Sequence, residues 1–245
     1  MKPDRSPTAA IGMSASDVIA SIVRFHNEIS AVTFMSYRVT PGLKARLRFD
    51  APVDVARLER WTAMLARGRV PTWTEVIESY FSSRGIPTIL RETLRHDKSG
   101  ERAFELRRDD LSDRALAEQI NWLGPDEALA VSSKVRLDSG RYAHIPMIDC
   151  ACSRSAENAE VMMAFFASTG QEDGVLLDSG ASYHYYGFRL LDEESWREFL
   201  GKCVLFEPMI DGRYIGHRLI DGYCRLRINH VTKKPKTPTV IARLG

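Results

Sequence analysis

The order of strand and helix patterns after residue 127 constrains the fold of this chain most strongly. Stretches rich in β-branched and apolar residues alternate with helical spacing in the order strand, strand, helix, strand, strand, helix, strand, strand. In that order the segments are 128–137, 143–151, 155–170, 174–180, 182–191, 192–201, 223–228 and 239–244. Strands that follow one another directly pair most simply as antiparallel neighbours. We therefore predict an α+β fold, a mostly antiparallel sheet with packed helices.

The first half of the chain carries a less regular pattern. Residues 1–14 are rich in Pro, Ser and Ala without periodicity, which predicts a disordered N-terminus. A helix is expected to begin at Ser16, because apolar residues follow at helical spacing as far as Ile29. The further expected elements are strands at 31–39 and 42–50, helices at 54–68, 73–84 and 110–123, and a charged loop or hairpin tip at 95–110.

Several classes of protein are disfavoured by motifs that the sequence lacks. It has no run of about 18 apolar residues, so we expect no membrane span, and no apolar signal core, so we expect a cytoplasmic protein. Neither a phosphate-binding P-loop nor a dinucleotide-binding glycine turn is present. The four cysteines are too few for a disulfide scaffold, and buried thiols are favoured over a zinc site built on Cys150 and Cys152.

Positive charge is concentrated at the C-terminal end. The formal net charge is only +2, yet residues 213–245 carry eight Lys and Arg residues against one acid, Asp221. A basic block on an otherwise acidic chain predicts a surface that meets phosphate groups. A solubilising tail remains the alternative.

Two aspartates end apolar runs and are candidates for metal ligation. Asp149 closes the run "HIPMID", and Asp211 closes a shorter run before a basic stretch. A carboxylate at the end of a buried strand is held rigidly, and hard cations prefer oxygen ligands. The alternatives are an aspartate that caps the next element and, for Asp211-Gly212, an ordinary turn dipeptide.

Ser182 and His184 form the third candidate feature. Residues two apart in a strand point to the same side, so the hydroxyl and the imidazole share one face of the predicted strand 182–191. Nothing in the sequence forces them into a nucleophile and base pair. A hydroxyl and an imidazolium that donate to phosphate oxygens fit better, and a half-buried structural histidine is the alternative.

Taken in order, these features resemble the archaeo-eukaryotic primase superfamily, the primases and primase-polymerases. The matching motifs are "IDCA" at Asp149, "SYH" at Ser182–His184, "ID" at Asp211, and the downstream stretch "GHRLIDGYCRLRI". With a single aspartate in the first motif, the chain resembles a bacterial primase-like sub-group. The resemblance covers about residues 127–240. It implies a primase-polymerase catalytic core, with a disordered 1–14, an N-terminal α/β module at 15–126 and an RRM-like catalytic module at 127–245.

The resemblance also implies a function and roles for residues. The activity would be metal-dependent addition of nucleotides to a 3′-hydroxyl on a DNA or RNA template, with a nucleoside triphosphate as substrate and Mg²⁺ or Mn²⁺ as cofactor. Asp149 and Asp211 would hold the metal and act in catalysis with His184. Phosphate contacts would come from Ser182, His184, His217, Arg218, Arg225 and Arg227. The short chain is compatible with a partner subunit or a helicase.

One departure from the family pattern concerns catalysis. The second acid of the first motif falls at position 151, where this chain has Ala151. Two-metal nucleotidyl transfer needs carboxylates that hold both ions, and Asp178, Asp221 or Glu157 are the available substitutes. Two alternatives therefore stay open: a catalytically degenerate relative that binds nucleotide or nucleic acid without polymerising, and an unrelated hydrolase or structural α+β protein.

Overall fold

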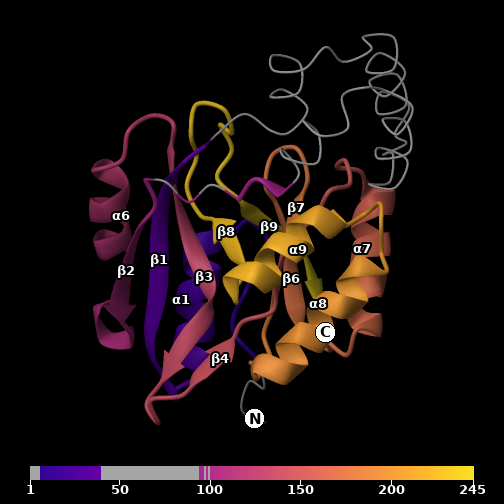
Figure 1. Ribbon diagram of the computed structural model, residues 1–245, viewed down its shortest axis with the longest axis horizontal. Coiled ribbons are helices and arrows are strands. Elements are labelled where there is room, and N and C mark those ends of the chain that lie inside the picture. Colours follow the sequence, from indigo (N-terminus) through magenta and orange to yellow (C-terminus); the bar gives the residue numbers. More distant parts are fainter. Residues whose placement is uncertain (1–5, 40–93, 97, 99) are drawn as a thin grey trace.

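The computed structural model describes residues 6–39, 94–96, 98 and 100–245 (Figure 1). The helices in these ranges are α1 (Ala15–Phe25), α6 (Asp113–Asn121), α7 (Ala156–Ser168), α8 (Glu193–Val204) and α9 (Gly212–Asp221), with a 3-10 turn η1 (Arg108–Asp110). The strands are β1 (Ile29–Arg38), β2 (Arg102–Arg107), β3 (Glu127–Leu137), β4 (Tyr142–His144), β5 (Met147–Asp149), β6 (Gly174–Asp178), β7 (Tyr183–Gly187), β8 (Arg225–Arg227) and β9 (Thr239–Leu244). The expected elements at 42–84 lie outside the described residues.

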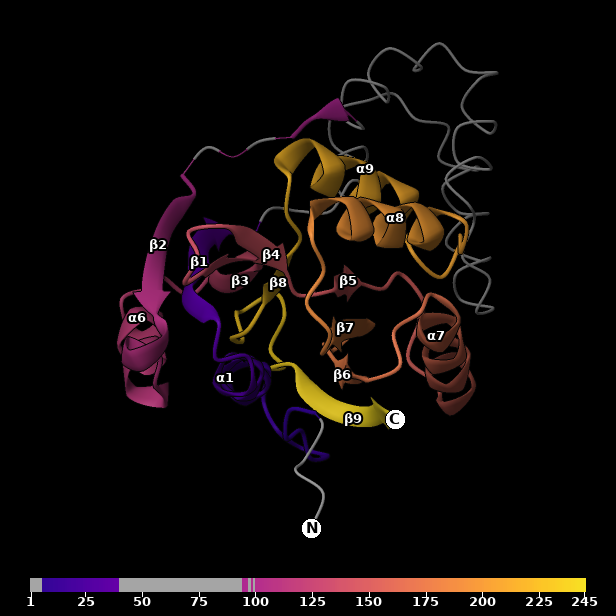
Figure 2. The same ribbon diagram turned by 90° about the horizontal axis from the view of Figure 1, so that it is seen from below.

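The described strands form two antiparallel sheets. One sheet has the order β2–β1–β3–β4, and β8 pairs with β3 beyond the end of β4. The other has the order β5–β7–β6–β9. Figure 2 shows α8 and α9 side by side on one side of the molecule, with α1 and β9 on the opposite side. The predicted α+β class with antiparallel sheets and packed helices is therefore confirmed.

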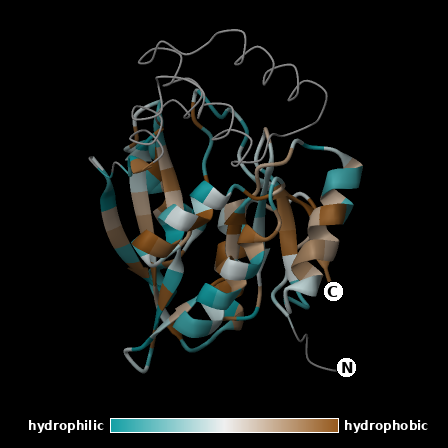
Figure 3. Cartoon of the chain, turned by 45° about the vertical axis from the view of Figure 1, so that its right-hand side comes forward, coloured by the Kyte–Doolittle hydropathy of each residue, from teal (hydrophilic) through white to brown (hydrophobic). Residues whose placement is uncertain are grey.

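Apolar packing joins the two sheets and the helices into one core. Figure 3 shows apolar residues along the strands and hydrophilic residues at intervals along the helices. Phe166 of α7 stacks on Tyr185 of β7 with ring centroids 3.7 Å apart, and Trp196 of α8 stacks on His144 of β4 at 4.3 Å. All four cysteines are buried as free thiols, as favoured from the sequence. None of the helices in the described ranges is long and apolar enough to span a membrane.

The N-terminal segment differs from its sequence prediction. The described part, residues 6–14, packs against β9: the Gly12 amide donates to the Val240 carbonyl at 2.8 Å, and Ala9 is buried. Ser14, not Ser16, caps α1 through a capping box with Asp17. This segment is ordered because it pairs with a strand from the other end of the chain, a contact that local composition does not reveal.

The predicted strand 143–151 is divided into two. Pro146 has no amide hydrogen to donate and interrupts the ladder, so that β4 joins β3 in one sheet and β5 joins β7 in the other. The Pro146 carbonyl still accepts a hydrogen bond from the Gly187 amide at 2.8 Å. This division carries Asp149 into the same sheet as His184.

Two further elements were not expected from the sequence. β2 lies within the predicted loop 95–110 and pairs residue by residue with β1, where Phe104 stacks on Phe34 at 5.7 Å. α9 follows Asp211, where the sequence indicated only a turn. Its two glycines, Gly212 and Gly216, lower its intrinsic helix propensity, and tertiary contacts with α8 override that preference.

The boundary predicted between residues 126 and 127 runs through a sheet. β1 and β2 come from the N-terminal side, and β3 comes from the C-terminal side, yet β1 is hydrogen-bonded to both β2 and β3. The division into an N-terminal module and a catalytic module remains a prediction.

Candidate functional site

Three chain segments bring His184, Asp149 and Asp211 into one row. Asp149 of β5 is the direct antiparallel partner of His184 of β7. On its other side, Cys150 forms a bridge with Ile210, and the Ala151 amide donates to the Met209 carbonyl at 2.8 Å. In that antiparallel register the next facing pair is Asp149 and Asp211. Two acids that are distant in sequence thus lie opposite each other.

The two aspartates line one pocket of about 290 Å³. The residues that form its walls are Asp149, Cys150, Ala151, Asp211, Arg213, Tyr214, His217 and Arg218. The side chains of Asp149 and Asp211 are 39% and 38% exposed, so their oxygens are open to a ligand. The pocket combines carboxylates with cationic donors, which is the composition expected for a site that binds a metal ion together with phosphate.

Asp149 has few partners of its own. His184 Nε2 lies 3.6 Å from Asp149 Oδ1, which is longer than a hydrogen bond, and within the described ranges no hydrogen bond reaches this carboxylate. Desolvation by the surrounding walls raises the pKa of Asp149, against the opposing charges of Lys234, Arg227 and Arg218. A carboxylate that is poorly compensated in this way gains from a bound cation.

Asp211 has a second task as the N-cap of α9. Its Oδ1 accepts a hydrogen bond from the Arg213 amide at 2.9 Å, and Oδ2 lies 3.9 Å from Arg213 Nε. The cap holds the carboxylate at the beginning of α9, where the helix dipole favours negative charge. Oδ2 accepts no hydrogen bond within the described ranges and is therefore available to a ligand.

His184 is buried, with 3% of its surface exposed. Burial lowers the pKa of His184 well below its usual value, and the charges of Arg227 and Lys234 act in the same direction. The ring is therefore neutral near pH 7 and has one N–H to donate. This corrects the sequence hypothesis of an imidazolium donor.

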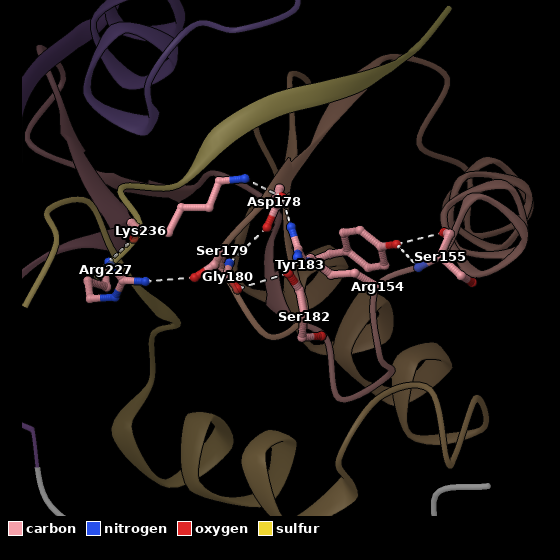
Figure 4. A network of polar contacts seen from close by, with 9 residues as sticks. All are labelled: Arg154, Ser155, Asp178, Ser179, Gly180, Ser182, Tyr183, Arg227 and Lys236. Carbon is pink, nitrogen blue, oxygen red and sulfur yellow. Dashed lines mark hydrogen bonds and ion pairs between the residues drawn. The ribbon is translucent and has the colours of Figure 1, made fainter. Parts of the chain in front are cut away.

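Ser182 is held in a tight polar network at the turn between β6 and β7 (Figure 4). Its hydroxyl donates to the Cys150 carbonyl at 2.6 Å. The same turn is closed by the Ser179 amide donating to the Ser182 carbonyl, and Asp178 just before it binds Arg154 and Lys236. Ser182 thus connects the first two motifs directly, through the backbone next to Asp149.

Arg218 and His217 of α9 reach the pocket from its helical wall. Arg218 is buried, forms an ion pair with Asp221 at 3.1 Å, and lies over the ring of Tyr214 at 5.3 Å. Within the described part of the chain, its Nε and Nη1 have no hydrogen-bond partner. His217 stacks on His96 with ring centroids 4.5 Å apart.

Arg225 and Arg227, the other two predicted phosphate contacts, do not line the pocket. Arg225 forms an ion pair with Glu101 and lies over Tyr37 at 4.8 Å. Arg227 donates to the carbonyls of Asn229, Lys236 and Ser179, the last two at 2.9 Å. Both guanidinium groups are thus used by protein partners, although the charge of Arg227 still acts on Asp149 and His184.

The residues present fit one hard cation better than two. Asp149 and Asp211 supply two carboxylates, which suits an Mg²⁺ ion that completes its shell with water and phosphate. Position 151 adds only a methyl group, and among the described residues no group of three or more His, Cys, Asp or Glu side chains is placed to hold a metal. Asp178 and Asp221 are occupied by cations, and Glu157 is exposed at the beginning of α7.

Arg213 and Tyr214 belong to the pocket but were not predicted as site residues. Both follow Asp211 on the first turn of α9. Helical spacing would have placed Tyr214 on one face with His217 and Arg218. The sequence did not predict this helix, because Gly212 and Gly216 weaken its helical pattern.

Comparison with known proteins identifies one family. A model described as "AEP-like: Archaeo-eukaryotic primase 1D-like" matches residues 107–239, more than half of the chain. The match extends from the end of β2 to the beginning of β9 and includes all three motifs. No curated protein and no solved structure matches the chain.

Proposed function

Because this chain belongs to the archaeo-eukaryotic primase-like family, we propose that it is a metal-dependent primase or polymerase that adds nucleotides to a 3′-hydroxyl on a nucleic-acid template. The family is one of primase-like nucleotidyltransferases. Membership is not compatible with an unrelated hydrolase or structural protein. We also propose that residues 127–245 form the catalytic module, and that the chain belongs to the sub-group with a single aspartate in the first motif.

The observation that carries the proposal is the shared pocket of Asp149, Asp211 and Arg218. Two carboxylates that face each other beside a buried guanidinium suit a triphosphate bound with a divalent ion. The two acids come from different motifs and meet only because residues 209–211 pair beside β5. Such a meeting is expected of a site that the first and third motifs build together, whereas Ser182 and His184 of the second motif do not line this pocket.

Each residue has a distinct task in this proposal. Asp149 and Asp211 hold Mg²⁺ or Mn²⁺, which when bound lowers the pKa of the attacking hydroxyl and screens phosphate charge. Arg218 and His217 donate to phosphate oxygens, and His184 contributes its N–H as a catalytic and phosphate-binding residue. The Ser182 hydroxyl donates to a phosphate only after it gives up its hydrogen bond to the Cys150 carbonyl.

The reaction itself requires positioning more than covalent chemistry. The 3′-oxygen forms a bond to the α-phosphorus, the bond from that phosphorus to the β-phosphate oxygen breaks, and pyrophosphate leaves while the hydroxyl proton passes to solvent. The cationic side chains of α9 stabilise the charge on the leaving pyrophosphate. Arg225 and Arg227 contribute long-range charge that favours a template backbone nearby.

Ala151 favours a second candidate function, a relative that binds nucleotide or nucleic acid without polymerising. A site that holds one ion would still bind a triphosphate, but it would activate the attacking hydroxyl less well than a site that holds two. The proposed partners are the same in this case: a nucleoside triphosphate and a DNA or RNA strand, with a partner subunit or helicase to supply what this chain lacks.

The test is template-directed incorporation of labelled nucleotides. Wild-type protein is offered primed and unprimed DNA and RNA templates with dNTPs or NTPs, in Mn²⁺ or Mg²⁺. We expect incorporation that EDTA abolishes and that Asp149→Asn or Asp211→Asn lowers by about 10²–10³-fold, since metal coordination contributes several kcal/mol to catalysis. Circular dichroism verifies that the variants are folded.

The outcomes separate the two functions. Incorporation that survives both substitutions contradicts the proposed site. Salt-sensitive nucleotide or template binding without any incorporation, by wild type under all conditions, favours the binding module, because phosphate contacts release counterions. Absence of both binding and incorporation excludes both functions.

A further inference from the structure

Asp221, at the end of α9, is a buried carboxylate surrounded by basic side chains. Its side chain has 0% exposure and contacts His96 Nε2 at 2.6 Å, Lys98 Nζ, and Arg218 Nη2 at 3.1 Å. Burial alone would raise the pKa of Asp221, but hydrogen bonds from Lys98 and His96 and the charge of Arg218 outweigh it and lower the pKa. Asp221 is therefore ionised, and these protein groups offset its charge, while in the described part of the chain its Oδ2 has an ion pair with Arg218 but no hydrogen-bond partner.

Arg218 connects this cluster to the pocket. One end of its guanidinium group is paired with Asp221, and its face lies over Tyr214. The side chain is only 7% exposed, and in the described part of the chain Nε and Nη1 have no hydrogen-bond partner. Buried donors without partners are costly, so an arginine held in this way at the wall of the pocket favours the binding of an anionic acceptor.

The segment before β2 supports the same wall from outside. His96 binds Asp221 and at the same time stacks on His217, which lines the pocket next to Arg218. Two neighbouring pocket residues of α9 are thus supported by a segment more than a hundred residues earlier in the chain. Neither His96 nor Asp221 is among the pocket-lining residues.

We infer that Asp221 is a positioning residue, which fixes the guanidinium of Arg218 so that its unpaired donors face the phosphates of the bound nucleotide. The inference rests on the proposed function for the identity of the anion. Asp221 acts through Arg218 and does not touch the metal or the nucleotide. It neutralises one end of the arginine and leaves the other end for the ligand, and this arrangement reduces the rotamer freedom that binding must remove.

The test is a double-mutant cycle on triphosphate affinity. Binding of inorganic tripolyphosphate and of a non-hydrolysable nucleoside triphosphate, each with Mn²⁺, is measured by calorimetry for wild type, Asp221→Asn, Arg218→Gln and the double variant. We expect Asp221→Asn to weaken binding by about 10–100-fold, the range for loss of an orienting partner. In the Arg218→Gln background it should change affinity less than about twofold.

Two further variants separate positioning from loss of fold. Glu193→Gln at the beginning of α8 removes the carboxylate partner of the buried His144 of β4. Because Glu193 does not line the pocket, this variant serves as the matched control and should leave the affinity unchanged. Asp221→Glu retains the charge and should recover part of the affinity that Asp221→Asn loses. Additive effects of Asp221→Asn and Arg218→Gln overturn the inference.

A spectroscopic measurement decides the inference without a ligand. In ¹⁵N-arginine-labelled protein, the Nη groups of Arg218 should rotate slowly in wild type and rapidly in Asp221→Asn. Unchanged Arg218 signals in that variant overturn the inference. Wild-type protein that binds no triphosphate, while Arg218 still loosens in Asp221→Asn, overturns the proposed function and leaves the positioning of Arg218 intact.

Discussion

Two kinds of aspartate occur in this protein, and the difference between them locates the site. Asp178 and Asp221 have side chains that are 8% and 0% exposed, and each is bound by two or more cationic side chains. Asp149 and Asp211 are more than a third exposed, face one pocket, and have few partners in the described ranges. The compensated acids hold loops and helices in place, whereas the uncompensated pair is available to a cation from solution.

Asp178, Asp221 and Glu157 were the candidates to replace the missing acid of the first motif. Asp178 closes the turn of Figure 4, Asp221 holds Arg218, and Glu157 lies exposed on α7, so none of the three lines the pocket. The structure favours a site with two carboxylates over one with a relocated third.

The largest effect expected from the comparison is on folding stability. Asp178→Asn should lower the free energy of unfolding by about 1–3 kcal/mol, because it removes the charge that binds Arg154 and Lys236. The lower part of that range applies because both cations are nearly half exposed. Asp149→Asn should change stability by less than about 0.5 kcal/mol. Urea unfolding measures both, and equal losses would contradict the distinction between the two kinds of acid.

The second prediction concerns the pH dependence of that loss. Burial by itself would raise the pKa of Asp178. Hydrogen bonds from Lys236, the Gly180 amide and Arg154 outweigh this effect and lower the pKa below the ordinary value of 3.8. The stabilisation is therefore present above pH 3.8 and is lost as the pH falls through the lower pKa of the folded state. The difference between wild type and Asp178→Asn should be constant from pH 7 to 5 and shrink below pH 3.8. A difference that grows in acid would exclude this ion pair as its cause.

The third prediction adds the missing acid to the pocket. Ala151 lines the pocket together with the two aspartates, and its amide donates a hydrogen bond to the Met209 carbonyl. Ala151→Asp should tighten Mn²⁺ binding about tenfold, since affinity for hard cations rises with the number of carboxylate ligands. Calorimetric titration of the nucleotide-free protein measures the change. Unchanged affinity would mean that position 151 does not reach the ion.

The smallest effect is expected at Glu157. This side chain is exposed and does not line the pocket. Glu157→Gln should alter stability by less than about 0.5 kcal/mol and nucleotide incorporation by less than about twofold. The variant serves as the matched control for Asp149→Asn. A large loss of incorporation would show that the acids of the site extend beyond the pocket.

Local sequence pattern was sufficient for most individual elements. The predicted helix and strand at 155–170 and 174–180 correspond to α7 and β6, with Ser155 as the N-cap. The pattern failed where local preference and tertiary context disagree. Gly212 and Gly216 concealed α9, and the charges of 95–110 concealed β2, which is held by pairing with β1. A charged strand at the outside of a sheet looks like a loop when its partner is unknown.

The sequence by itself determined the residue types and their order: an aspartate after an apolar run, a serine and histidine two residues apart, and a second aspartate before a basic stretch. It did not reveal which of them meet, because pairing register between distant strands depends on the whole sheet. Only the tertiary structure placed Asp149 between His184 and Asp211, aimed Arg218 at the same pocket, and committed Arg225 and Arg227 to protein partners. Burial and charge compensation, which decide what each side chain is free to bind, exist only once the chain is folded.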